Sequence, residues 1–292
     1  MRLDLTNKNI LSAIGNTPLV KINEKLYAKL ETYNPTGSIK DRIALYLLSK
    51  AEWRGEIKPG DTIVEATSGN TGIAFSMIGA VKGYKVKIIM PCNMSEERKQ
   101  MMKLFGAEVI EVGHSDFANA IHLRNQMSSQ EGYWSPRQFE NLDNIECHAE
   151  TTAREIIKQL FVEEQKNIGA LICGAGTGGT IMGCNKTLIK LDKGMKTVLV
   201  QPEEDAQTHG IQGINDGADF LVDRSILTDE IKVSTQDATD RARKLAKESG
   251  YLVGISAGAN ILAAERWLES NEINGAAITF LCDRGERYMS LL

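Results

Sequence analysis

The feature that most constrains this chain is the alternation of strand-like and helix-like apolar periods along almost its whole length. Such alternation is typical of a parallel sheet whose crossover connections are helices, so the residues predict an α/β fold. Strands rich in β-branched residues are expected at 27–31, 62–66, 85–90, 108–112, 170–173, 197–201 and 277–281. Helices are expected over 38–53, 72–82, 95–105, 147–164, 178–190, 237–248 and 257–268.

Composition excludes several classes of protein. With 42% hydrophobic and 25% charged residues among 292, the chain is neither disordered nor fibrous. A net charge of −4 and the lack of a Lys/Arg block argue against nucleic acid as a partner. The longest charge-free stretch, Ile168–Asn185, is interrupted by glycines, so no membrane span is expected, and the polar N-terminus shows no secretory signal.

The cysteines and histidines predict no metal site. Five scattered cysteines without a C-x-x-C pair indicate reduced thiols in the cytoplasm. Cys147 and His148 are adjacent, but neighbours on a helix point about 100° apart and cannot chelate one ion together. The four histidines are interpreted as surface or structural residues.

Three turns rich in Gly, Ser and Thr follow expected strands, where ligands lodge in open α/β sheets. The first comprises Thr67, Ser68, Gly69, Asn70, Thr71 and Gly72. It supplies three hydroxyls and an amide, more than the single side chain a helix cap needs, which favours an anion site over a plain cap. The third turn, Gly254–Gly258, contains Ser256, and a plain cap also explains it.

The second turn, Gly174–Thr180, has the chemistry of a phosphate cradle. Its glycines let backbone N–H groups converge, and Thr177 and Thr180 add hydroxyls. It also fits G-x-G-x-x-G through Gly174, Gly176 and Gly179, so a nicotinamide-dependent dehydrogenase remains an alternative. The acidic residue that such a site needs at the ribose would be Glu203 or Glu204.

The stretch Asn34–Arg42 places Lys40 in the first turn of a helix that Ser38 is expected to cap. The positive end of the helix dipole makes an amine there easier to deprotonate, which suits a nucleophile or base. Judged by its position alone, a solvated surface lysine is the better interpretation.

Together these segments carry a family resemblance. Ile14–Val20, Asn34–Arg42, Thr67–Gly72, Gly176–Thr180, Gly254–Gly258 and Gly285–Tyr288 resemble, in order, the signature segments of the cysteine synthases, or O-acetylserine sulfhydrylases. The segments Gln201–Glu204 and Cys282–Gly285 resemble the B-type branch most. The resemblance implies a two-domain, tryptophan synthase β-like pyridoxal-phosphate (PLP) enzyme of fold-type II, with parallel-rich twisted sheets flanked by helices.

The resemblance assigns a role to each turn. Lys40 would hold PLP as a Schiff base and act as the catalytic base. Asn70 would contact the ring hydroxyl and Ser256 the pyridine nitrogen. The cofactor phosphate would be bound by Gly176, Thr177, Gly178, Gly179 and Thr180. The substrate carboxylate would be gripped by Thr67, Ser68, Gly69, Thr71 and, from the segment Gln138–Asn141, Gln138.

The implied reaction is β-replacement, in which O-acetyl-L-serine and sulfide give L-cysteine through an α-aminoacrylate. Other donors or nucleophiles, namely O-phosphoserine, thiosulfate, homocysteine or cysteine, remain alternatives. B-type relatives commonly carry arginines in the stretch matching Gly210–Ile214, where they can receive a larger anion. This chain has none there, so the resemblance favours O-acetylserine. The resemblance further implies a homodimer, possible docking to serine acetyltransferase, a larger cofactor-binding domain over 1–36 and 147–292, and a smaller mobile domain over 37–146 that grips the carboxylate.

Overall fold

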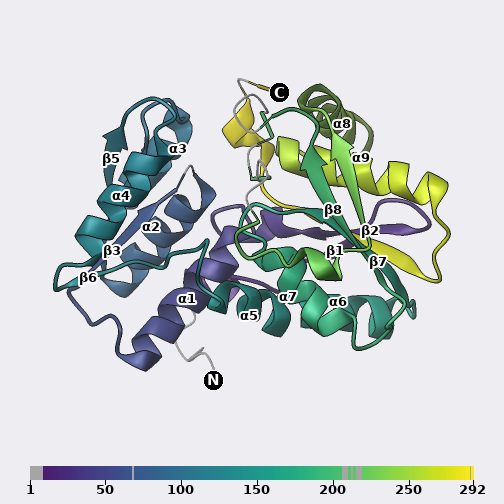
Figure 1. The fold of residues 1–292 in the computed structure, drawn as a ribbon, viewed down its shortest axis with the longest axis horizontal. Coiled ribbons are helices and arrows are strands. Elements are labelled where there is room, and N and C mark those ends of the chain that lie inside the picture. Colours follow the sequence, from purple (N-terminus) through teal and green to yellow (C-terminus); the bar gives the residue numbers. More distant parts are fainter. Residues whose placement is uncertain (1–8, 68, 206–209, 212, 215–218, 290) are drawn as a thin grey trace. The chain divides into compact units, whose positions relative to one another are not determined.

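The computed structural model describes residues 9–67, 69–205, 210–211, 213–214, 219–289 and 291–292. The chain divides into two compact units (Figure 1). One comprises the residues up to Ile14 together with Lys40–Asp143, and the other comprises Gly15–Ile39 and Asn144–Leu292.

The smaller unit is built on a four-stranded parallel sheet in the order β5-β4-β3-β6. Its strands are β3 (Thr62–Ala66), β4 (Lys85–Pro91), β5 (Glu108–Val112) and β6 (Tyr133–Trp134), and its helices are α1 (Lys40–Arg54), α2 (Asn70–Lys82), α3 (Glu96–Leu104) and α4 (Phe117–Ser128), with a 3-10 turn at Ile10–Ala13. Val64, Ala66 and Ile89 form a core with Ala120 of α4. On the other face of this sheet, Gly72 of α2 lies against Ile88, whose side chain points away from that of its neighbour Ile89.

The larger unit contains a six-stranded sheet in the order β1-β2-β10-β7-β8-β9, parallel except for the β1–β2 hairpin. The strands are β1 (Leu19–Lys21), β2 (Leu26–Leu30), β7 (Ile168–Gly174), β8 (Lys196–Pro202), β9 (Asp229–Val233) and β10 (Ala276–Leu281). The short connection between β1 and β2 is a tight hairpin, in which the N–H groups of Ile22 and Asn23 both donate to the carbonyl oxygen of Leu26.

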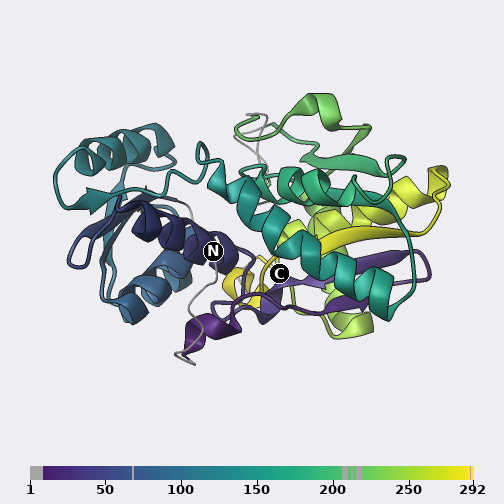
Figure 2. The same ribbon diagram turned by 90° about the horizontal axis from the view of Figure 1, so that it is seen from below.

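Helices cover both faces of this six-stranded sheet, as Figure 1 shows. Helices α8 (Thr235–Ser249) and α9 (Ile255–Ser270) share one core with alternate residues of the strands. Helices α6 (Thr152–Ile157) and α7 (Gly179–Leu188) share the other core, which includes Tyr27 and Phe280. Seen from below, the teal helices α5 (Asp143–Glu150) and α6 run across one side of the unit (Figure 2). Short 3-10 turns lie at Glu31–Tyr33, Arg224–Ile226 and Gly285–Tyr288.

The α/β prediction is confirmed, and every expected strand is present. The strands β1, β6 and β9 and the helix α4 were not predicted. The expected helix over 147–164 is wrong as a single element, because it is divided at Thr151 and ends in a π-helical turn, Lys158–Glu163. The Thr151 hydroxyl donates to the Cys147 carbonyl at 2.6 Å, a bond that often bends a helix.

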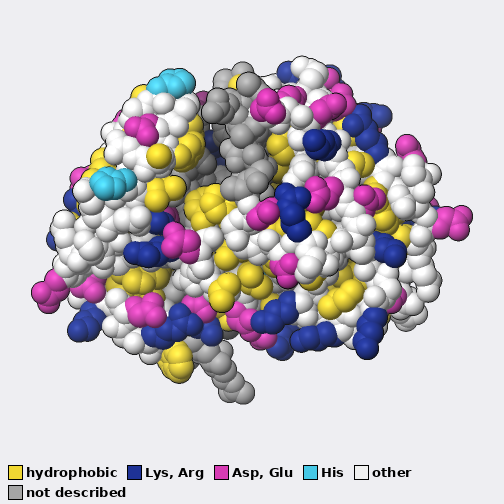
Figure 3. All heavy atoms as spheres, in the orientation of Figure 1, with side chains coloured by type: hydrophobic (Ala, Val, Ile, Leu, Met, Phe, Trp, Pro, Cys, Tyr) yellow, Lys and Arg dark blue, Asp and Glu magenta, His cyan; other side chains and the backbone are white. Residues whose placement is uncertain are grey.

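Surface charge is mixed in sign. Lys and Arg side chains are interspersed with Asp and Glu over the face shown in Figure 3. Within the described parts of the chain, no helix combines the length and the apolarity needed to cross a bilayer. The same residues include no group of three or more His, Cys, Asp or Glu side chains arranged to hold a metal ion.

Candidate active site

The turn between β3 and α2 presents hydroxyls and backbone donors within the smaller unit. Ser68 lies outside the described residues. The Gly69 N–H donates to Thr67 Oγ1 at 3.3 Å, and α2 begins at Asn70. The first N–H groups of a helix have no intrahelical acceptor and attract anions. The chemistry of this turn therefore suits a carboxylate.

The structure brings Gln138 to this turn. Thr71 Oγ1 donates to Gln138 Oε1 at 2.7 Å, although the two residues are 67 positions apart in sequence. Both side chains are buried. The turn that contains Thr71 and the segment that contains Gln138, which the resemblance assigned to the same carboxylate site, are therefore in contact.

Lys40 is the half-buried first residue of α1, and the backbone just before it is firmly held. The Ile39 N–H donates to the Cys282 carbonyl at 2.9 Å, and Ser38 forms an antiparallel bridge with Asp283. Ser38 thus lies two residues before the helix, one further than the capping position that the sequence predicted. The backbone that leads into Lys40 is therefore fixed to the residues that follow β10.

Glycine is required at several positions of the turn between β7 and α7. Gly178 is left-handed, with φ of 90°, and ends the turn as the N-cap of α7. A Cβ added at Gly176 would lie 2.7 Å from the Gly213 carbonyl oxygen, and one added at Gly179 would overlap Asn144 Oδ1. The crowding explains why glycine rather than a residue with a side chain occupies these positions.

Two residues that sequence reasoning did not assign to the site hold these threonines. Asn144 Nδ2 donates to Thr177 Oγ1 at 3.0 Å. The buried ring of His148 contacts Thr180 Oγ1 through Nε2 at 3.2 Å and Thr152 Oγ1 through Nδ1 at 2.9 Å. His148 is thus a structural histidine beside the turn. The only sequence signal was its place on a helix preceding β7, which could not reveal the contact.

Ser256 is buried in the first turn of α9. The Gly254 N–H donates to the Asp283 carbonyl at 3.1 Å, and a Cβ at Gly254 would overlap the Asp283 carboxylate. A Cβ at Gly258 would overlap the Ala238 carbonyl of α8. Packing therefore accounts for both glycines of this turn.

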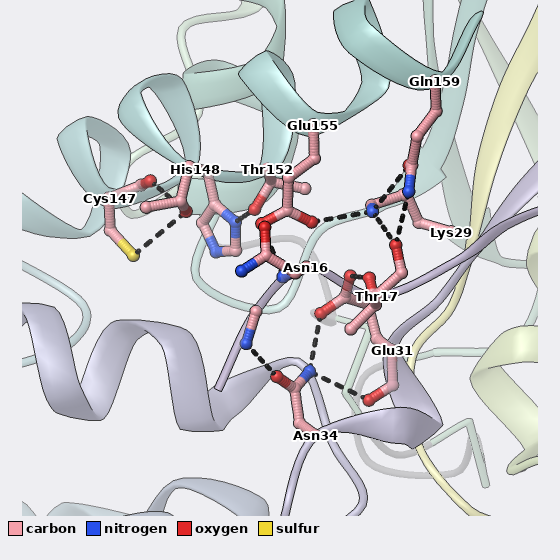
Figure 4. Close-up of polar contacts among 12 residues, drawn as sticks. Asn16, Thr17, Lys29, Glu31, Asn34, Cys147, His148, Thr152, Glu155 and Gln159 are labelled. Carbon is pink, nitrogen blue, oxygen red and sulfur yellow. Dashed lines mark hydrogen bonds and ion pairs between the residues drawn. The ribbon is translucent and has the colours of Figure 1, made fainter. Parts of the chain in front are cut away.

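A buried polar cluster supports the segment that precedes β1 (Figure 4). Lys29 Nζ donates to the Thr17 carbonyl at 2.5 Å, to Glu155 Oε2 at 2.8 Å and to Gln159 Oε1 at 3.0 Å. Asn34 accepts from the Gly15 N–H at 2.9 Å and donates to Glu31 Oε2 at 2.8 Å. These contacts tie Gly15–Thr17 to the start of the segment that leads to Lys40.

The cysteines carry free thiols. Cys173 lies on β7 just before the glycine turn, and burial raises the pKa of its thiol well above the usual range. A fully buried, protonated thiol is a poor nucleophile. Cys173 is therefore a core residue.

Comparison with known proteins identifies the class of enzyme. Residues 10–283 match the family described as pyridoxal-phosphate dependent enzyme. The chain is therefore a PLP-dependent enzyme, and the dehydrogenase alternative is wrong. Glu204, one of the two acidic residues considered for a ribose, accepts from the Thr235 N–H through Oε1 at 2.7 Å.

Closer relatives narrow the class. A cysteine synthase of Staphylococcus aureus is 41% identical over 97% of this chain and 95% of its own length. Cysteine synthase B of Escherichia coli is 38% identical over 95% of this chain and 93% of its own. The crystal structure of a hydrogen sulfide-producing enzyme from Fusobacterium nucleatum has a TM-score of 0.88 and 39% identity, covering 96% of this chain and 99% of that one. The chain belongs to the cysteine synthase family.

The residues present fit PLP. The glycine turn offers backbone N–H groups at the start of the ten-residue helix α7 together with threonine hydroxyls, which is the donor set that a phosphate requires. Extra side-chain atoms at Gly176 or Gly179 would collide with neighbouring atoms. Lys40 supplies an amine that can bond to an aldehyde.

Proposed function

We propose that this enzyme makes L-cysteine from O-acetyl-L-serine and sulfide by β-replacement. Membership of the cysteine synthase family supports the reaction class. The observation that carries the proposal is the 2.7 Å hydrogen bond between Thr71 and Gln138, which joins two segments of polar groups suited to an amino-acid carboxylate.

The cofactor-binding roles remain those implied by the sequence. Lys40 would hold PLP covalently, Gly176–Thr180 would bind its phosphate, Asn70 would contact the ring hydroxyl and Ser256 the pyridine nitrogen. When bound, PLP supplies an electron sink for negative charge at the substrate α-carbon. The neutral Ser256 hydroxyl stabilises a protonated ring nitrogen less than a carboxylate would, which favours rapid elimination over a long-lived carbanion.

The chain's own groups would bind the substrate and move its proton. The carboxylate is gripped by Thr67, Ser68, Gly69, Thr71 and Gln138. The Lys40 amine removes the α-proton and returns it after sulfide has added at the β-carbon. The smaller domain, 37–146, is proposed to be mobile and to exclude water during this step. The larger domain, 1–36 and 147–292, would bind the cofactor through Gly176–Thr180 and Ser256.

The donor is proposed to be O-acetylserine. The segment Gly210–Ile214 contains no arginine to pair with a phosphate dianion, and its Ile211 and Ile214 are buried. Gln212, in the middle of the segment, lies outside the described residues. A steady-state comparison tests this, and a higher kcat/KM with O-phosphoserine would overturn it.

A homodimer in the cytoplasm is proposed, with serine acetyltransferase as a candidate partner. Five free thiols fit a reducing compartment, and the dimer and the partner follow from the family resemblance. Light scattering, alone and after mixing with serine acetyltransferase, tests both assemblies. A monodisperse monomer that is unchanged by the mixture would contradict both.

Product identification tests the reaction itself. The enzyme is offered O-acetylserine or O-phosphoserine with sulfide, thiosulfate, homocysteine or cysteine, and the products are identified by mass spectrometry. Because the F. nucleatum relative is a hydrogen sulfide-producing enzyme, production of hydrogen sulfide is the second candidate activity. Cysteine from O-acetylserine and sulfide is the expected main product, and its absence would contradict the proposal.

A further inference from the structure

The smaller unit contains a buried ion pair beside the substrate turn. Arg124, on α4, has the largest side chain among the fully buried residues that the structure describes. Its NH1 lies 3.3 Å from Glu65 Oε1, and the two side chains are 2% and 0% exposed. Glu65 is the penultimate residue of β3, two positions before Thr67. The charges of Glu65 and Arg124 are therefore buried close to the turn that begins at Thr67.

Both oxygens of Glu65 accept from the backbone. The Ala66 N–H donates to Oε1 at 2.8 Å, and the Gln138 N–H donates to Oε2 at 3.3 Å. Burial raises the pKa of Glu65, while Arg124 and the two backbone N–H groups oppose that shift. The carboxylate thus connects the end of β3 to the backbone of Gln138, 73 positions later.

The backbone next to Gln138 is strained. Arg137 has a left-handed conformation with φ of 48°, which is unfavourable for a residue with a Cβ. Such strain persists only where the surroundings fix the backbone. The bond from Gln138 N–H to Glu65 is one of the contacts that hold this position.

Stability alone gives a weak reason for the pair. Burying two charges costs free energy, and apolar replacements of similar volume are often neutral or stabilising. The pair instead fixes the orientation of Gln138, whose side chain contacts Thr71. We propose that Glu65 and Arg124 are positioning residues for the amino-acid substrate, because together they orient Gln138 toward the carboxylate-binding turn. This inference rests on the proposed function of that turn.

The variant Glu65→Gln tests the proposal in the PLP-loaded enzyme. Oε1 accepts from both Arg124 and the Ala66 N–H, so the amide oxygen stays at that position. The NH2 group then replaces Oε2, faces the Gln138 N–H and loses the bond from it. The readouts are PLP content, the Kd of L-serine from the change in cofactor absorbance, and the Kd of L-serinamide, which lacks the carboxylate.

We expect the Kd of L-serine to rise about tenfold in Glu65→Gln, as for loss of one hydrogen bond, while the Kd of L-serinamide changes by less than about twofold. PLP content should be unchanged. The matched control is Glu52→Gln, which removes the ion pair with Lys82 at the far end of α2 and should leave both Kd values as in the wild type.

The double variant Glu65→Leu with Arg124→Met separates positioning from folding, since replacing both charges by apolar groups keeps the core neutral. It should fold, bind PLP and still show the weakened, carboxylate-specific binding. Wild-type Kd values for L-serine in this folded variant would overturn the inference. No spectral response to L-serine in the wild type would instead overturn the proposed function, and the inference with it.

Discussion

The substitution Gly179→Ala probes how the phosphate turn is held. An added Cβ would overlap Asn144 Oδ1, so the Asn144 side chain must move. Moving it breaks the 3.0 Å bond from Nδ2 to Thr177 Oγ1, which is buried. The Thr177 hydroxyl would then lose the shorter of its two contacts and keep the one from the Gly179 N–H at 3.3 Å.

The size of the effect follows from that bond. Alanine favours the helix by about 1 kcal/mol over glycine, but this gain is present with and without cofactor and cancels in binding. Leaving a buried polar group without its partner costs about 1–3 kcal/mol. A loss near the lower end, about 1.4 kcal/mol, raises the Kd of PLP about tenfold.

The assay is equilibrium titration of the apoenzyme with PLP. Gly250→Ala is the control, because φ at Gly250 is 73° and a Cβ there would meet nothing within 4 Å. It should lower stability by about 1–2 kcal/mol without changing the Kd of PLP.

A double-mutant cycle with Asn144→Ala completes the test. If the reasoning is right, the double variant binds PLP no more weakly than Asn144→Ala alone, because the overlap has gone. Additive losses of PLP affinity in the double variant, or a wild-type Kd of PLP in Gly179→Ala, would show that Asn144 does not mediate the effect.

Three further predictions concern single side chains. Lys40→Ala should abolish the cofactor absorbance that borohydride removes from the wild type and lower kcat by at least about 10²-fold; turnover near the wild-type rate would exclude Lys40 as the base. Lys29→Met leaves Glu155 without its buried partner and should reduce the free energy of unfolding in urea by about 3 kcal/mol, and a loss below about 1 kcal/mol would contradict that estimate. His148→Phe removes the ring nitrogen that contacts Thr180 and should weaken PLP binding about tenfold in the same titration, so unchanged affinity would show that the contact is dispensable.

Elements with a strong apolar period were predictable, and those without one were not. The strand β9 reads Asp-Glu-Ile-Lys-Val and lies at the edge of its sheet, where three of its five residues are exposed. The strand β6 has two residues and forms only by pairing with Thr62 and Ile63. The pairing partner, rather than local propensity, creates such strands.

The site divides in the same way. The positions of Lys40 and of the first two turns could be predicted, because a strand that ends in Gly, Ser and Thr before a helix produces free N–H groups wherever it folds. The third turn was also expected to follow a strand, which is wrong, because only an isolated bridge at Val253 precedes it. The roles of His148 and Asn144 could not be predicted, since their partners Thr180 and Thr177 lie 32 and 33 positions away in sequence.

The sequence by itself therefore determined the order of strands and helices and the local chemistry of each turn, because both depend on neighbouring residues. Only the tertiary structure decided which distant side chains hold those turns in place. Glu65 and Arg124 are 59 positions apart, and their contact exists only because the sheet and α4 pack together. Hydrogen bonds act over about 3 Å, so packing selects their partners.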